Sequence, residues 1–180
     1  MRNFNNSSVA FVLGAACLLG TAALAQEPPV NISAARHPHL AGAQQECKQA
    51  WIKLGEAQKA NDWDMQGNAQ RAKGLLVQAG ELMKQAAESA NQNAYKPKPG
   101  SGPTGQAPVV NISPARHPHL AAAQQLVQQA WQKMVEAQKA NDWDMDGHAQ
   151  KAKDLLAQAT KDLKAAALAA NAGGAAKQGK

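Results

Sequence analysis

The chain has 180 residues, of which 44% are hydrophobic, 18% are charged and only 4% are aromatic, and its net charge is +6. A composition rich in Ala, Gln and Lys favours helices and argues against a β-sheet fold. The Lys residues are interleaved with Gln, Glu and Asp, which is typical of a solvated helix face and not of a nucleic-acid-binding surface. We therefore expect an all-α protein that does not bind nucleic acid.

The N-terminal segment has the features of a secretory signal. Arg2 is followed by an uncharged apolar stretch at 9–24, and Ala23-Leu24-Ala25 matches the small-x-small cleavage signature. Cleavage near Ala25 predicts a periplasmic or secreted bacterial protein of net charge +5, because the 19 basic residues lose Arg2 and the 13 acidic residues stay. The apolar stretch is short for a membrane span and no second one follows, so we expect no stable membrane insertion after signal removal.

Most of the remaining chain is a tandem repeat. Residues 30–91 align without a gap with residues 110–171, and 42 of the 62 positions are identical. The segment between the copies is rich in Pro, Gly, Ser and Lys, which is linker composition. The predicted organisation is a signal peptide at 1–25, a first helical hairpin at 26–91, a linker at 92–107, a second hairpin at 108–171 and a flexible tail at 172–180.

Each copy carries two apolar stripes with heptad spacing, the pattern of coiled-coil seams and helical bundles. The first stripe contains Leu40, Ala43, Cys47, Ala50, Leu54 and Ala57, matched by Leu120, Ala123, Val127, Ala130, Met134 and Ala137. The second contains Met65, Ala69, Ala72, Leu76, Ala79, Met83, Ala86 and Ala90, matched by Met145, Ala149, Ala152, Leu156, Ala159, Leu163, Ala166 and Ala170. These stripes predict two helices per copy, joined as an antiparallel hairpin.

The Ala recurring every seventh residue lets two helices approach closely, so we expect a tight hairpin within each copy. We expect Asp64 and Asp144 to be the N-caps of the second helices, and Pro38 and Pro118 to lie in the first turns of the first helices. One hairpin is marginal alone, so a four-helix bundle is the expected fold, with two hairpins on a flexible string as the alternative. The expected layer between hairpins contains Trp51, Leu75, Leu126, Trp131, Leu155 and Leu168.

Two cysteines are present, and Cys17 lies in the signal segment. The mature chain would keep only Cys47, so an internal disulfide is excluded. Cys47 falls on an apolar stripe, where a small buried side chain is expected. Disulfide formation between two molecules is the alternative.

The repeated His-Pro-His motif is the main candidate for chemistry. It places His37 with His39 and His117 with His119, and imidazole is a common ligand of Cu, Ni and Zn. Two hairpins side by side would bring both pairs to one end and give four imidazoles. An antiparallel arrangement would instead bring one pair near the acidic turn of the other copy. Polar helix-entry residues without a ligand are the alternative to a metal site.

Trp63 and Trp143 lie in the predicted turns, where an aromatic side chain can anchor a partner or fold over its own hairpin. The sequence contains no phosphate-binding loop, haem motif or carboxylate pair, and no nucleophile accompanies the His and Asp residues. We therefore do not expect an enzyme or a bound organic cofactor.

The segments Arg-His-Pro-His-Leu-Ala-x-Ala-Gln-Gln and Ala-Asn-Asp-Trp-Asp-Met-x-Gly resemble helical-hairpin repeats of uncharacterised exported bacterial proteins. The resemblance covers both repeats and implies export and a hairpin fold, but no activity. The expected function is a non-catalytic structural or interaction module of the cell envelope, whose partner is an envelope protein or a second copy of the chain. The alternative is a periplasmic protein that binds Cu, Ni or Zn through the four His.

Overall fold

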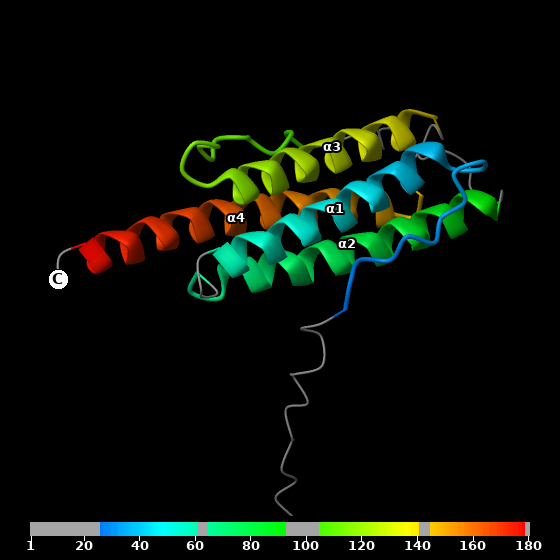
Figure 1. Ribbon diagram of the computed structural model, residues 1–180. Helices are drawn as coiled ribbons and strands as arrows, with labels where there is room; N and C mark the ends of the chain where they lie inside the picture. Colours follow the sequence, from blue (N-terminus) through cyan, green and yellow to red (C-terminus); the bar gives the residue numbers. More distant parts are fainter. Residues whose placement is uncertain (1–25, 61–64, 93–104, 141–144, 179–180) are drawn as a thin grey trace, which may run out of the picture.

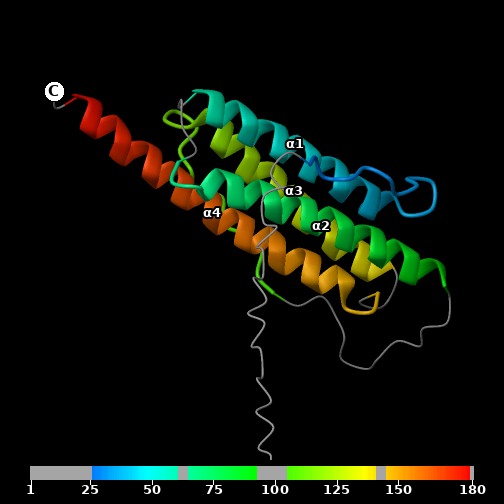
Figure 2. The same cartoon turned by 90° about the horizontal axis from the view of Figure 1, so that it is seen from below.

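The computed structural model describes residues 26–60, 65–92, 105–140 and 145–178, and this part of the chain is helical with no strands. Its elements are α1 (Pro38–Ala60), α2 (Asn68–Asn91), α3 (Pro118–Ala140) and α4 (His148–Gln178). The four helices form a bundle of two hairpins (Figures 1 and 2), which confirms the predicted fold class. No described helix is both long and apolar enough to cross a membrane.

Neighbouring helices in the bundle are antiparallel. Helix α1 packs against α2 and α3, and α4 packs against the same two helices. The antiparallel register of α1 and α3 is visible in Gly42, whose position near the start of α1 faces the side chain of Lys133 near the end of α3. Helices α2 and α3 therefore run in the same direction, so that the end of α2 and the start of α3 lie at opposite ends of the bundle (Figure 1).

The closest helix pairs join the two repeats. More backbone contacts connect α1 to α3 and α2 to α4 than connect the two helices of either hairpin. The expectation of a tight hairpin within each copy was therefore wrong. The physical reason is an extended segment before each first helix, residues 26–33 and 106–113, which we call the arm. In the first repeat the arm contacts both helices, since Asn31 hydrogen-bonds Gln44 of α1 and Pro29 lies against Gly80 of α2.

The apolar stripes form one continuous core. All of the stripe residues named above are buried except Ala90, which is partly buried against the core. The bundle has no separate layer between hairpins, because all four stripes face a common centre. Of the residues expected in such a layer, five lie at the edge of the core and Leu168 is 60% exposed.

The second helix of each hairpin starts later than expected. The N-cap of α2 is Gly67, with no side-chain cap, so the prediction of Asp64 in this role was wrong. Met65, Gln66 and Gly67 have φ values of 56°, 59° and 75°, and the three residues before His148 repeat this left-handed turn. The turn buries Met65 completely, and burial of this side chain offsets the strain of a left-handed non-glycine residue. Asp64 and Asp144 themselves lie outside the described residues.

The first helices start where the sequence predicts, whereas the last helix is longer than expected. Pro38 and Pro118 are the first residues of α1 and α3, as expected for a residue without a backbone N–H. Helix α4 extends to Gln178, through most of the segment at 172–180 that was expected to be a flexible tail. Its alanines allow the helix to continue past the end of the repeat.

Cys47 lies on the buried face of α1 and is a free thiol. Burial, and the negative charge of Glu46 beside it, raise the pKa of the Cys47 thiol to about 12. The reactive thiolate is therefore suppressed, and disulfide exchange between folded molecules is opposed by both access and ionisation.

In each hairpin a lysine of the second helix packs on a tryptophan of the first helix. The Lys73 ammonium of α2 lies 3.9 Å from the centre of the Trp51 ring of α1 and donates a hydrogen bond of 3.3 Å to Gln58. In the second repeat Lys153 lies 5.0 Å from the Trp131 ring centre. Burial, and then the charge of Lys59, lower the pKa of Lys73. These contacts join the two helices of a hairpin where their apolar stripes end.

Candidate functional site

The two His-Pro-His motifs lie at opposite ends of the bundle. The Nδ1 atom of His39 is 2.9 Å from the Glu136 carboxylate, and that of His119 is 2.8 Å from the Glu56 carboxylate. Each pair therefore joins the start of one first helix to the end of the other. The structure does not bring the four imidazoles together, because α1 and α3 run in opposite directions.

Each motif lines a shallow hollow, which we call an end pocket. The first end pocket has a volume of about 200 Å³ and the second about 210 Å³. The first is lined by Arg36, His37, Pro38, His39, Leu40, Ala137 and Ala140. The second is lined by Ala57, Ala60, Arg116, His117, Pro118, His119 and Leu120. These two sets occupy the same positions of the repeat, so the ends are chemically equivalent.

Hydrogen bonds hold the first histidine of each motif, which is His37 in the first repeat and His117 in the second. The Nε2 atom of His37 lies 3.0 Å from the Asn91 side-chain oxygen at the end of α2, and His117 has the same contact with Asn171. Each imidazole uses its Nε2 atom in this contact, and its second ring nitrogen, Nδ1, is not part of it. The motif is therefore fixed to both the first and the second helices around it.

The carboxylates at the two ends are exposed, and Glu56 is held ionised. A hydrogen bond from Lys53, and with smaller weight one from His119, lower the pKa of the Glu56 carboxyl. Each end can therefore present an Arg, a carboxylate and two imidazoles to a ligand or a protein surface.

The described residues contain no group of three or more His, Cys, Asp or Glu side chains placed to hold a metal ion. His117 and His119 line a pocket together with Ala57 and Ala60 of α1. The acidic segment that follows Ala60 in the sequence lies outside the described residues, so the expected approach of one His pair to it stays a prediction. Trp63 and Trp143, the candidate interaction residues, lie outside them too. His148 begins α4, and its buried Nδ1 atom has no hydrogen-bond partner within the described part of the chain.

Sequence reasoning missed a pair of buried glutamines that bind the arms. Gln44 is fully buried, accepts hydrogen bonds from the backbone N–H groups of Asn31 and Ile32, and donates to the Asn31 side chain and the Gly80 carbonyl. Gln124 binds the second arm in the same way. The signal was the identity of Gln and Asn at matching positions of both repeats, which a Gln-rich composition conceals.

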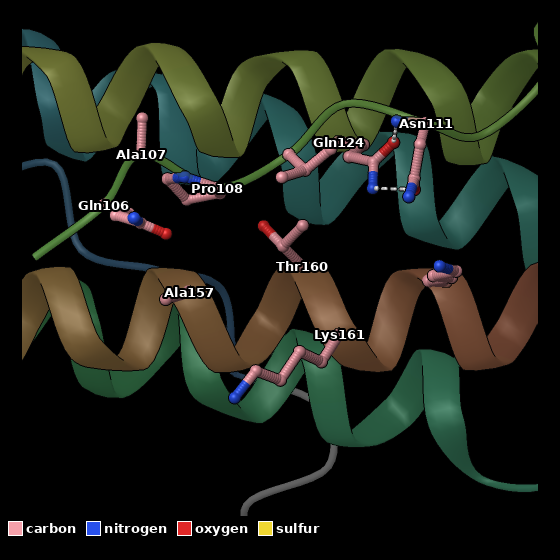
Figure 3. Close-up of a pocket in the computed structure, with 10 residues that line it drawn as sticks. Gln106, Ala107, Pro108, Asn111, Gln124, Ala157, Thr160 and Lys161 are labelled. Carbon is pink, nitrogen blue, oxygen red and sulfur yellow. Dashed lines mark hydrogen bonds between the residues drawn. The ribbon is translucent and has the colours of Figure 1, made fainter.

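A larger pocket lies between the second arm and α4. Its volume is about 350 Å³, and Figure 3 shows Thr160 of α4 pointing toward the arm. The lining also includes Val109, Ala157, Lys161 and Lys164. Nothing in the sequence motifs indicated this pocket, because it arises from how the arm lies on the bundle.

Comparisons with known proteins find no matching family model, no matching curated sequence and no matching solved structure. The functional argument therefore depends on the repeat and on the geometry of the bundle.

Proposed function

We propose that this chain is a non-catalytic, exported interaction module that connects two partner molecules in the bacterial cell envelope. The observation that carries the proposal is the presence of two equivalent end pockets at opposite ends of one rigid bundle. A surface that recognises one end also recognises the other, so the chain is bivalent.

The identity of the end pockets supports a shared role. All seven lining positions are the same residue in both repeats, whereas only 42 of the 62 repeat positions are identical. A helix of 23 residues, such as α1, separates the two ends by about 35 Å at 1.5 Å per residue. That separation lets two partners bind without contacting one another, and bivalent binding raises the apparent affinity for a partner that is itself repeated or assembled.

The exposed Arg36 and Arg116 provide the test. A photo-reactive residue at either position, in bacteria that export the chain, should give adducts of the same mass with the same protein. The same residue in place of exposed Lys84, on the side of α2, is the matched control and should give no such adduct. The purified complex should contain two partner molecules per chain, and one after Arg36→Glu. Different adducts from the two ends, or a one-to-one complex for the unchanged chain, would refute the proposal.

Transition-metal binding is the alternative function. The geometry changes the expected number and position of the metal sites, because the two His-Pro-His motifs lie at opposite ends of the bundle. One imidazole contacts one carboxylate at each end, and the other His of each motif contacts an Asn side chain, so any metal would bind at two separate ends and not at one site with four His. Calorimetric titration of the mature chain with Cu(II), Ni(II) and Zn(II) should then give two equivalents, with a rise in melting temperature. Replacing His37 and His39 with Ala should remove one equivalent and leave the helicity unchanged. No binding and unchanged melting would eliminate this alternative.

A further inference from the structure

The two repeats differ where the arm lies on the second helix. Ten residues line the pocket of the second repeat, and five of them differ from their counterparts in the first repeat. The second repeat has Ala107, Val109, Ala157, Thr160 and Lys161 where the first has Glu27, Pro29, Val77, Gly80 and Glu81. The end pockets show no such differences, so the two kinds of pocket diverge to different extents between the repeats.

The substitutions open the space between the arm and the helix. In the first repeat the arm rests on Gly80, and a Cβ atom built there would lie 2.8 Å from the Pro29 ring. Thr160 has a Cβ at this position, and its hydroxyl donates a hydrogen bond of 3.1 Å to the Leu156 carbonyl. The second arm therefore cannot lie as close to its helix. The side chain of Ala157 is also smaller than that of its counterpart, which enlarges the gap.

The first arm is held down by contacts that the second arm lacks. Gln44 donates a hydrogen bond of 2.9 Å to the Gly80 carbonyl, and Lys48 pairs with Glu27 at 3.0 Å. The second repeat has Ala107 in place of the acidic residue, and Gln128 donates instead to the backbone carbonyl of Pro108 in the arm. The second arm is therefore bound to α3, while the gap toward α4 stays open.

The same substitutions reverse the charge of the pocket. The first repeat has two Glu and one Lys at the lining positions, a net charge of −1, and the second has Lys161 and Lys164, a net charge of +2. The floor is apolar and is formed by Ala157 of α4, and the apolar side chains of Pro108 and Val109 in the arm form the roof. Figure 3 shows the Lys161 side chain extended along α4 with its ammonium group directed away from the arm, and rotation about its flexible four-carbon stem would bring that group to the mouth of the pocket.

We propose that this pocket binds a small anionic amphiphile, namely a carboxylate with a medium-length hydrocarbon chain. The chain would lie on the apolar floor, and Lys161 and Lys164 would bind the carboxylate. A volume of about 350 Å³ is at the lower end of the range for small-molecule sites, which fits a single short chain and not a two-chain lipid. This proposal does not depend on the role of the end pockets.

The test uses decanoate and its neutral analogue decanol, titrated by calorimetry into the mature chain below the concentration at which either aggregates. Decanoate should bind with one equivalent and at least tenfold more tightly than decanol. Lys161→Glu introduces the acidic residue that the first repeat has at this position, lowers the net charge of the lining from +2 to 0 and should weaken decanoate binding about tenfold. Lys151→Glu makes the same charge change at an exposed position of α4 outside the pocket lining and is the matched control.

A second variant tests the shape of the pocket. Val109→Pro combined with Thr160→Gly restores the arm contact of the first repeat and should abolish binding without lowering the melting temperature. Equal affinity for decanoate and decanol would overturn the proposal, as would equal losses in Lys161→Glu and Lys151→Glu. Full binding by a folded double variant would overturn it too, because the ligand would then lie elsewhere.

Discussion

Replacing Ala50 with Leu should lower the free energy of unfolding by about 3 kcal/mol. Ala50 is fully buried on α1, and α1 and α3 are one of the two closest helix pairs in the bundle. Three added carbons have no space there, so the helices must separate or the side chain must leave its preferred rotamer. Ala130 holds the same position in α3, and the same substitution there should have a similar effect.

Urea denaturation followed by circular dichroism at 222 nm measures this effect. A loss of about 3 kcal/mol corresponds to a fall in melting temperature of roughly 6–12 °C for a chain of this size. Gln45→Leu introduces the same side chain at an exposed position of the same helix and should change stability by less than about 0.5 kcal/mol. Equal stability of the Ala50 and Gln45 variants would mean that the helices are not closely packed at Ala50.

The expected loss of stability at Ala50 depends on the burial of this residue, which is a property that the sequence predicts well. Burial follows the heptad period, and the period can be counted, so the sequence predicts most of the core residues of all four helices. The helix starts at Pro38 and Pro118 were also predicted, because proline has one favourable position in a helix.

Helix pairing could not be predicted from the same pattern. The stripes of α1, α2, α3 and α4 have similar mixtures of Ala and larger side chains, so none of them specifies its neighbour. The arm decides between the pairings, because it occupies the groove between the two helices of its own hairpin and leaves α1 free to approach α3. A short extended segment with few apolar residues gives no periodic signal of this role.

The sequence predicts only some residues of the candidate sites, for a related reason. His39 and His119 were identified from their motif, but their partners Glu136 and Glu56 depend on the antiparallel register of α1 and α3. The pocket of the second repeat depends on small differences between two arms. Such features combine residues from distant segments, and a single sequence does not say which segments meet.

Replacing Gln44 with Leu should release the first arm and lower the free energy of unfolding by about 3 kcal/mol. Four hydrogen bonds converge on this buried side chain, each with a net value of about 1 kcal/mol, and the added apolar surface recovers part of the loss. The structure gives Gln124 three such bonds, because its amide donates to Asn111 and not to the helix opposite. Gln124→Leu should therefore cost about 1 kcal/mol less.

Hydrogen exchange distinguishes release of an arm from general loss of stability. In Gln44→Leu the backbone amides of Asn31 and Ile32 should lose protection while the amide of Ile112 keeps it, and Gln124→Leu should give the reverse pattern. Gln45→Leu, one residue away and exposed, should leave both arms protected. Uniform loss of protection across the bundle would contradict the role of Gln44 as an arm anchor. A selective loss in the second arm would also remove the roof of the pocket beside α4, so decanoate binding should disappear in Gln124→Leu and persist in Gln44→Leu.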